Sequence, residues 1–217
     1  MSLQNTAPRP TNARDDNSLC GFLFCFKKCS GCTPQNESIP NLIIEKMVDV
    51  LTWSDLIHVE FVPVRQYCDE KNTIIMCPYS YTAFMSCGFV RKQSYDCCDR
   101  KLFTHVYVPL DNESTHRGIA FLESMVGERY NRLGMWHAFC HQFLWSAAVD
   151  GIYTPHMHKR PVFCSEAGLM LCYLVGKYNG PERPMYCTPK MLYRILQDDA
   201  GLHLRRRPEP TLLVMDA

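Results

Sequence analysis

The sequence predicts an α+β fold, in which a group of strands is followed along the chain by a group of helices. At 56–64 and again at 103–110, successive residues alternate between two faces, which is the period of a half-buried strand. Beyond residue 115, apolar residues recur every three or four positions, which is the period of a helix that packs on a core. We expect one domain at 38–200, between a flexible N-terminal arm rich in Cys and Phe at 1–37 and a loose C-terminal tail at 201–217.

The composition of the 217 residues is that of an ordinary globular protein, with 47% hydrophobic and 21% charged residues. The formal net charge of +1 argues against a strongly basic nucleic-acid-binding protein, and we expect no nucleic-acid partner. No apolar run approaches the roughly 20 residues of a transmembrane helix, and the polar N-terminus does not resemble a signal peptide. The 13 cysteines are an odd number and fall below the roughly 8–10% typical of a disulfide scaffold. We therefore expect free thiols in a reducing, cytoplasmic compartment, with membrane association or packaging in a virion as alternatives.

The N-terminal arm has an unusual composition between residues 18 and 34. Phenylalanines alternate with cysteines and are followed by Lys27 and Lys28. Three interpretations stay open: a mobile arm that packs on the domain, a zinc ligand set, and a lipid-modified segment that makes peripheral contact with a membrane. The four cysteines concerned are Cys20, Cys25, Cys29 and Cys32.

The folded part begins with a helix-like pattern at 39–51 and continues with a strand at 56–64. A turn at 66–72 separates that strand from a second one at 73–80. We expect residues 81–100 to form a loop with one short strand at 88–92, and residues 103–110 to form a further strand.

The second half of the chain carries helical stripes. Gly127 is expected to end the first helix, and Gly176 lies near the end of the helix that follows Phe163. Thr188 followed by Pro189 is a typical helix start, because threonine caps the free N–H groups and proline fits the first turn.

Cys164 is the cysteine with the most suggestive context, because it follows an apolar, strand-like pair and directly precedes an amphipathic helix. Free N–H groups and the helix dipole at such a position lower the pKa of a thiol and favour the nucleophilic thiolate. The same N–H groups can hold an oxyanion. The alternative is a structural cysteine at a helix start.

A nucleophilic thiol needs a base, and His58 on the strand at 56–64 is the first candidate. Glu60 lies two residues further on the same face, about 6.5–7 Å away by strand rise, and could orient the imidazole. The alternative is a half-buried histidine that bonds to a backbone carbonyl.

Histidine pairs also permit a metal site. His137 and His141 are spaced by one helical turn, and His156 and His158 share a face if their segment is extended. No carboxylate accompanies them at metal spacing, so we expect no metal and no cofactor.

Several short motifs, in order along the chain, resemble the circularly permuted branch of the NlpC-type papain-like cysteine hydrolase superfamily, which is related to lecithin retinol acyltransferase-like enzymes and has versions in bacteria and large DNA viruses. The resemblance spans about residues 40–197. Its motifs are Ser54-Asp55-Leu56-Ile57-His58-Val59-Glu60, then Gly127-Glu128-Arg129-Tyr130-Asn131, then Phe163-Cys164-Ser165-Glu166, and then Thr188-Pro189 with Leu192 and Leu196.

The resemblance implies a papain-like α+β fold, in which a small antiparallel sheet packs on helices. It implies Cys164 as nucleophile and His58 as base, with Tyr130 lining the site near the oxyanion; Ser165, beside the nucleophile, is a further candidate for oxyanion or substrate contact. We expect a thiol-dependent hydrolase or acyltransferase that acts on an amide or ester bond of a peptide or lipid substrate. The alternative is an inactive papain-like protein used for binding in a virion or on a host protein.

Overall fold

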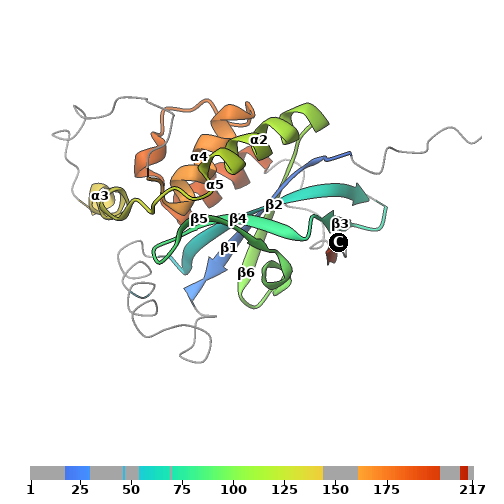
Figure 1. Cartoon of the computed structure of the whole chain (residues 1–217), viewed down its shortest axis with the longest axis horizontal. Helices are drawn as coiled ribbons and strands as arrows, with labels where there is room; N and C mark the ends of the chain where they lie inside the picture. Colours follow the sequence, from blue (N-terminus) through green and yellow to red (C-terminus); the bar gives the residue numbers. More distant parts are fainter. Residues whose placement is uncertain are drawn as a thin grey trace, which may run out of the picture.

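The computed structural model describes residues 18–29, 46, 54–68, 70–143, 161–200 and 211–214, and these form an α+β fold with a mainly antiparallel sheet. The main strands lie in the order β5-β4-β2-β1-β6, and β3 links β2 to β7 (Figure 1). The strands are β1 (Gly21–Lys28), β2 (Leu56–Cys68), β3 (Thr73–Met76), β4 (Tyr79–Phe84), β5 (Gly88–Gln93), β6 (Phe103–Pro109) and β7 (Thr211–Val214). The α+β class predicted from the sequence is confirmed.

Strand β1 lies inside the sheet between β2 and β6, so the expected flexible arm at 1–37 is wrong for residues 18–29. β1 pairs with β2 on one edge and with β6 on the other. Its residues are apolar on both faces, which is typical of a strand that is covered on both sides. Phe22, Phe24 and Phe26 are at most 1% exposed, so they are not available for the membrane contact that we considered. Residues 1–17 and 30–37 lie outside the described residues.

Strand β2 carries β1 along one edge, and β4 and β3 follow one another along the other edge. The strand predicted at 56–64 is confirmed, but it continues to Cys68, where a turn was expected. The strand predicted at 73–80 is divided at Pro78, because proline has no N–H to donate to a ladder. The predicted loop at 81–100 mostly consists of the end of β4, of β5, and of the short helix η2 (Tyr95–Cys98).

The last predicted strand, β6, is confirmed. The C-terminal tail at 201–217 was expected to be loose, and this is wrong for residues 211–214. They form β7, which runs parallel to β3 and pairs with it from Thr73 to Met76.

The helices are α2 (Asn112–Met125), α3 (Arg132–Phe143), α4 (Cys164–Leu174) and α5 (Pro189–Ala200), with a short helix η4 (Pro184–Tyr186). Helices α2, α4 and α5 lie on the same side of the sheet (Figure 1). Thr188 starts α5 as predicted, since its Oγ1 accepts from the N–H of Met191 at 3.3 Å. Gly127 and Gly176 follow α2 and α4 with φ of 91° and 70°, in the left-handed conformation that ends helices. The helix predicted at 39–51 lies outside the described residues, apart from Lys46.

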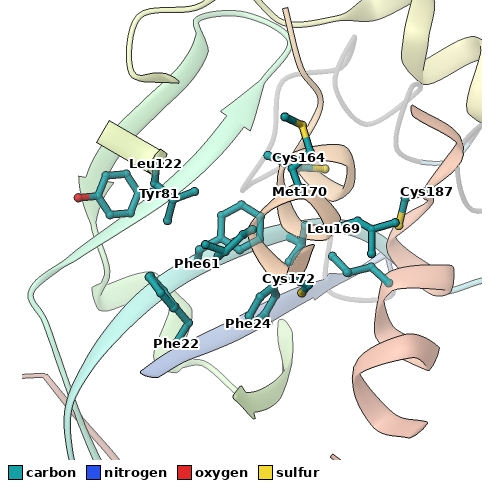
Figure 2. Close-up of a cluster of buried hydrophobic side chains, with 14 of the residues drawn as sticks. Phe22, Phe24, Phe61, Tyr81, Leu122, Cys164, Leu169, Met170, Cys172 and Cys187 are labelled. Carbon is teal, nitrogen blue, oxygen red and sulfur yellow. The ribbon is translucent and has the colours of Figure 1, made fainter. Parts of the chain in front are cut away.

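Each face of the sheet is covered by its own apolar core. The larger core lies between the sheet and the helices, and Figure 2 shows Phe61 of β2 and Phe24 of β1 beside α4, and Tyr81 of β4 beside Leu122 of α2. Helix α4 lies very close to β2, because a Cβ on Gly168 would stand 3.0 Å from the ring of Phe61. The smaller core lies on the other face, where Cys97 of η2 packs with Leu23, Cys25 and Val62. The close approach at Gly168 holds α4, and therefore its first residue, against β2.

Candidate functional site

Cys164 is the first residue of α4, as the sequence predicted. Phe163 before it is extended, with φ of −110° and ψ of 167°, and its C=O accepts from the N–H of Ala167 at 3.0 Å to begin the helix. The N–H of Phe163 bonds to the side chain of Glu166 at 3.4 Å, which satisfies a backbone donor at this end. Cys164 is only 3% exposed.

The environment of the Cys164 sulfur contains opposing influences on its pKa. The backbone N–H groups of Val59, Ser165 and Cys164 itself stabilise the thiolate, while burial destabilises it. Burial is the larger effect, and it raises the pKa of Cys164 to about 11. The prediction that the helix start would lower this pKa is therefore wrong, because the apolar core around the sulfur outweighs the dipole. At neutral pH Cys164 is a thiol.

His58 precedes Val59 on β2, and its imidazole is held by two residues of β4. Its Nε2 lies 2.7 Å from Oγ1 of Thr82, and its ring stacks on Phe84 with ring centroids 5.1 Å apart. The Thr82 hydroxyl also donates to the carbonyl of Val59 at 3.1 Å. A hydroxyl has one proton, so Oγ1 must accept from Nε2–H of a neutral His58. This leaves Nδ1 unprotonated and able to receive a proton.

The pKa of His58 lies at about 3, well below its usual value. Burial is the main cause, and the positive charges of Lys27 and Lys92 add to it. His58 is therefore neutral over the physiological range. The imidazole of His58 and the thiol of Cys164 are therefore both uncharged in the resting protein, and they do not form a thiolate–imidazolium ion pair.

Cys164 contacts β2 at Val59, the residue next to His58, but the two side chains lie on different faces of the sheet. The sulfur reaches the N–H of Val59 from the helix face, where Val59 and Cys164 share one core. Side chains alternate along a strand, so His58 points to the opposite face, with Thr82 and Phe84. Among the described residues, no hydrogen bond joins the Cys164 sulfur to the imidazole. The Cys–His contact that we expected is not formed in this state.

Glu60 does not orient His58, so the role predicted for it is wrong. Its carboxylate accepts from Ser80 Oγ and from Cys97 Sγ, both at 3.1 Å, and its other oxygen lies 3.0 Å from Nζ of Lys92. Thr82 orients the imidazole instead. Thr82 could not be predicted from the sequence pattern, which indicates a strand that ends at residue 80, whereas β4 continues to Phe84.

Tyr130 and Ser165 both lie near Cys164, but their hydroxyl groups bond elsewhere. Burial raises the pKa of Tyr130, and the neighbouring ionisable groups Cys164 and Glu166 add to this effect. Its hydroxyl donates to the Met135 sulfur at 3.3 Å. The Ser165 hydroxyl is buried and donates to the carbonyl of Cys187 at 2.7 Å, so it ties α4 to the segment before α5. For Ser165, the group that faces the reactive sulfur is the backbone N–H.

The metal alternatives find no support in the part of the chain that the structure describes. No cluster of three or more His, Cys, Asp or Glu there is arranged to hold a metal ion. His156, His158 and Cys32 lie outside the described residues. No disulfide joins two of the cysteines that the structure describes. Among the described helices, none has the length and apolar character needed to cross a membrane.

Comparison of the chain with models of known protein families, with curated proteins and with solved structures found no match.

Proposed function

We propose that the chain is a thiol-dependent hydrolase or acyltransferase of the permuted papain-like type, which acts on an amide or ester bond through Cys164 and His58. One observation carries the proposal. The Cys164 sulfur, at a helix start, contacts the N–H of the residue next to His58, and Thr82 keeps the Nδ1 atom of that histidine free of a proton.

The reaction begins from the neutral pair. Because the two side chains lie on opposite faces of the sheet, the reaction requires a local rearrangement of the β2 backbone that brings the imidazole to the helix face. Nδ1 then takes the thiol proton as the S–C bond to the substrate carbonyl forms. The N–H groups of Cys164 and Ser165 donate to the oxyanion. His58 then protonates the leaving amine or alcohol, and water or a second acceptor cleaves the thioester. Thr82 accepts from Nε2–H in the resting protein and is the positioning residue, because this bond sets the tautomer of His58.

A second candidate is a binding protein that keeps this fold without the chemistry. The observations that favour it are the 3% exposure of Cys164, its pKa of about 11, and the hold of Thr82 and Phe84 on the imidazole. In such a protein the thiol would be a core residue.

Labelling of Cys164 separates the two candidates. The full chain is treated with peptide-like and lipid-like acyl electrophiles, and the modified cysteine is identified by peptide mass spectrometry. If the chain is an enzyme, Cys164 is labelled selectively, His58→Ala abolishes the labelling, and Thr82→Val slows it. Cys172→Ala, which removes another buried thiol of α4, is the matched control and leaves the labelling unchanged.

The same variants are also treated with iodoacetamide over a range of pH. Labelling that follows an apparent pKa of about 11 and does not change in His58→Ala would refute the enzyme and favour the binding protein. Cys164→Ala is expected to change the free energy of unfolding by only about 1 kcal/mol, so that any loss of turnover is a loss of chemistry.

A further inference from the structure

The face of the sheet opposite the helices contains a second thiol cluster, which the proposed reaction does not use. Cys25 lies in the middle of β1, where it pairs with Glu60 of β2 on one side and with His105 of β6 on the other. Residues that pair across antiparallel strands point to the same face. The side chains of Cys25, Glu60 and His105 therefore form a row across three strands.

Cys97 of η2 lies over the middle of this row. Its Sγ donates to Oε2 of Glu60 at 3.1 Å, and its carbonyl oxygen is 2.6 Å from Nε2 of His105. Because Cys97 contacts the residues on both sides of Cys25, its thiol lies next to that of Cys25. Both residues are 0% exposed and belong to the same core. Burial is the main cause that raises the pKa of Cys25, and the neighbouring Cys97 adds to it.

The two thiols differ from an ordinary apolar contact because a carboxylate, that of Glu60, accepts a hydrogen bond from one of them. Glu60 is a buried carboxylate, 2% exposed, and Lys92 at 3.0 Å compensates its charge. An ionised carboxylate is an acceptor only, so the hydrogen of this bond belongs to the Cys97 thiol. A thiol reacts as its thiolate, and the bonded carboxylate is placed to take the proton that must leave.

We propose that Cys25 and Cys97 form a reversible dithiol–disulfide pair, with Glu60 as the proton acceptor and a peroxide as the oxidant. The Cys97 proton passes to Glu60, and the sulfur attacks one peroxide oxygen. The O–O bond breaks, a sulfenic acid forms on Cys97, and the leaving hydroxide takes the proton from Glu60 as water. The Cys25 sulfur then attacks the Cys97 sulfur, the S–O bond breaks, and the Cys25 proton leaves with the hydroxide as a second water.

The two thiols thus supply the two electrons that reduce the peroxide, and a dithiol reductant reverses the reaction. Access requires only a local opening, because η2 is a turn of four residues and the next thiol, Cys98, is already partly exposed. The disulfide would fix η2 to the central strand β1. This inference does not depend on the proposed function at Cys164.

The test uses the full reduced chain, with hydrogen peroxide as the oxidant. After brief exposure, free thiols are alkylated and disulfides are located by peptide mass spectrometry. We expect a Cys25–Cys97 linkage in the folded chain, reversed by a dithiol and absent from Cys97→Ala. Glu60→Gln, which keeps the shape of the side chain, should slow its formation by about 100-fold, as loss of a positioned proton acceptor does. Cys172→Ala removes a thiol from the other core and should form the linkage at the wild-type rate.

Wild-type mapping alone can overturn the proposal, whether or not the variants fold. If peroxide oxidises exposed Cys87 while Cys25 and Cys97 remain free thiols, the pair is a structural contact. If the Cys25–Cys97 linkage forms only after unfolding in urea, or at the same rate in Glu60→Gln, the role of the folded site is refuted.

Discussion

Replacing Lys92 with Met tests the electrostatics that hold the buried carboxylate of Glu60. The variant keeps an apolar side chain of similar length over the ring of Phe84, which Nζ approaches to 5.4 Å from the centroid, but it removes the positive charge. Glu60 then remains buried, with only the donors from Ser80 and Cys97. The protein must keep an uncompensated charge or protonate it.

The size of the effect follows from the burial of the two partners. Removing one partner of a buried ion pair destabilises a protein by about 3–5 kcal/mol. The side chain of Glu60 is 2% exposed but that of Lys92 is 28% exposed, so water partly screens the pair and the lower end applies. We expect a loss of about 3 kcal/mol, which lowers the midpoint of thermal unfolding by about 6–12 °C for a chain of this size.

Urea unfolding of Lys92→Met, Glu60→Gln and the double variant measures the coupling between the two side chains. We expect the double variant to lose less than the sum of the single losses, by more than about 1 kcal/mol. The pair Arg91–Glu123, whose side chains are 53% and 40% exposed, is the control, with an expected coupling below about 1 kcal/mol. If the effects of Lys92→Met and Glu60→Gln simply add, the ion pair does not contribute as we argue.

Further predictions concern pH, a glycine and a helix cap. Unfolded His58 takes up a proton near pH 6.5 while folded His58 does so at about 3, so the unfolded state binds more protons between these values and stability falls as pH falls. The slope is at most about 1.4 kcal/mol per pH unit, and urea unfolding from pH 7 to pH 4 should be less pH-dependent in His58→Gln. Gly88→Ala should reduce the free energy of unfolding by more than about 2 kcal/mol and so lower the urea midpoint, because φ is +79° and the new Cβ would stand 2.2 Å from the backbone oxygen of Glu128. An unchanged midpoint would contradict this. Thr188→Ala removes the cap bond to Met191 and should cost about 1 kcal/mol in the same assay, whereas Thr188→Ser should retain most of it.

The sequence predicted elements well where one local pattern determines the structure. The alternation at 56–64 and the Thr188-Pro189 start are such patterns, and both are found in the structure. The segment at 18–29 was misjudged because its apolar residues on two faces have no period of their own. A strand of this kind is defined by its neighbours β2 and β6, which are distant in sequence.

The position of the site residue Cys164 in its helix could be predicted from the sequence, but the contacts of His58 and Glu60 could not. The position of Cys164 at a helix start follows from local sequence, and the structure has it there. Its pKa depends on how deeply α4 is buried, which no local pattern shows. The contact between Thr82 and His58 joins residues of two strands, and it depends on the length of β4. The spacing of His58 and Glu60 predicted a shared face, but not that Lys92 and Cys97 would bind the carboxylate.

Because β1 pairs with β2 on one edge and with β6 on the other, residues 18–29 complete the sheet between these two strands. A chain trimmed back to residue 38 would expose the facing edges of β2 and β6, and such unpaired edges recruit other polypeptides. We expect a synthetic peptide of residues 18–29 to pair with the exposed edges of β2 and β6 by strand addition and to restore the continuous sheet. Because Phe22, Phe24 and Phe26 also belong to the core under the helices, loss of this segment would remove part of that core as well as a strand.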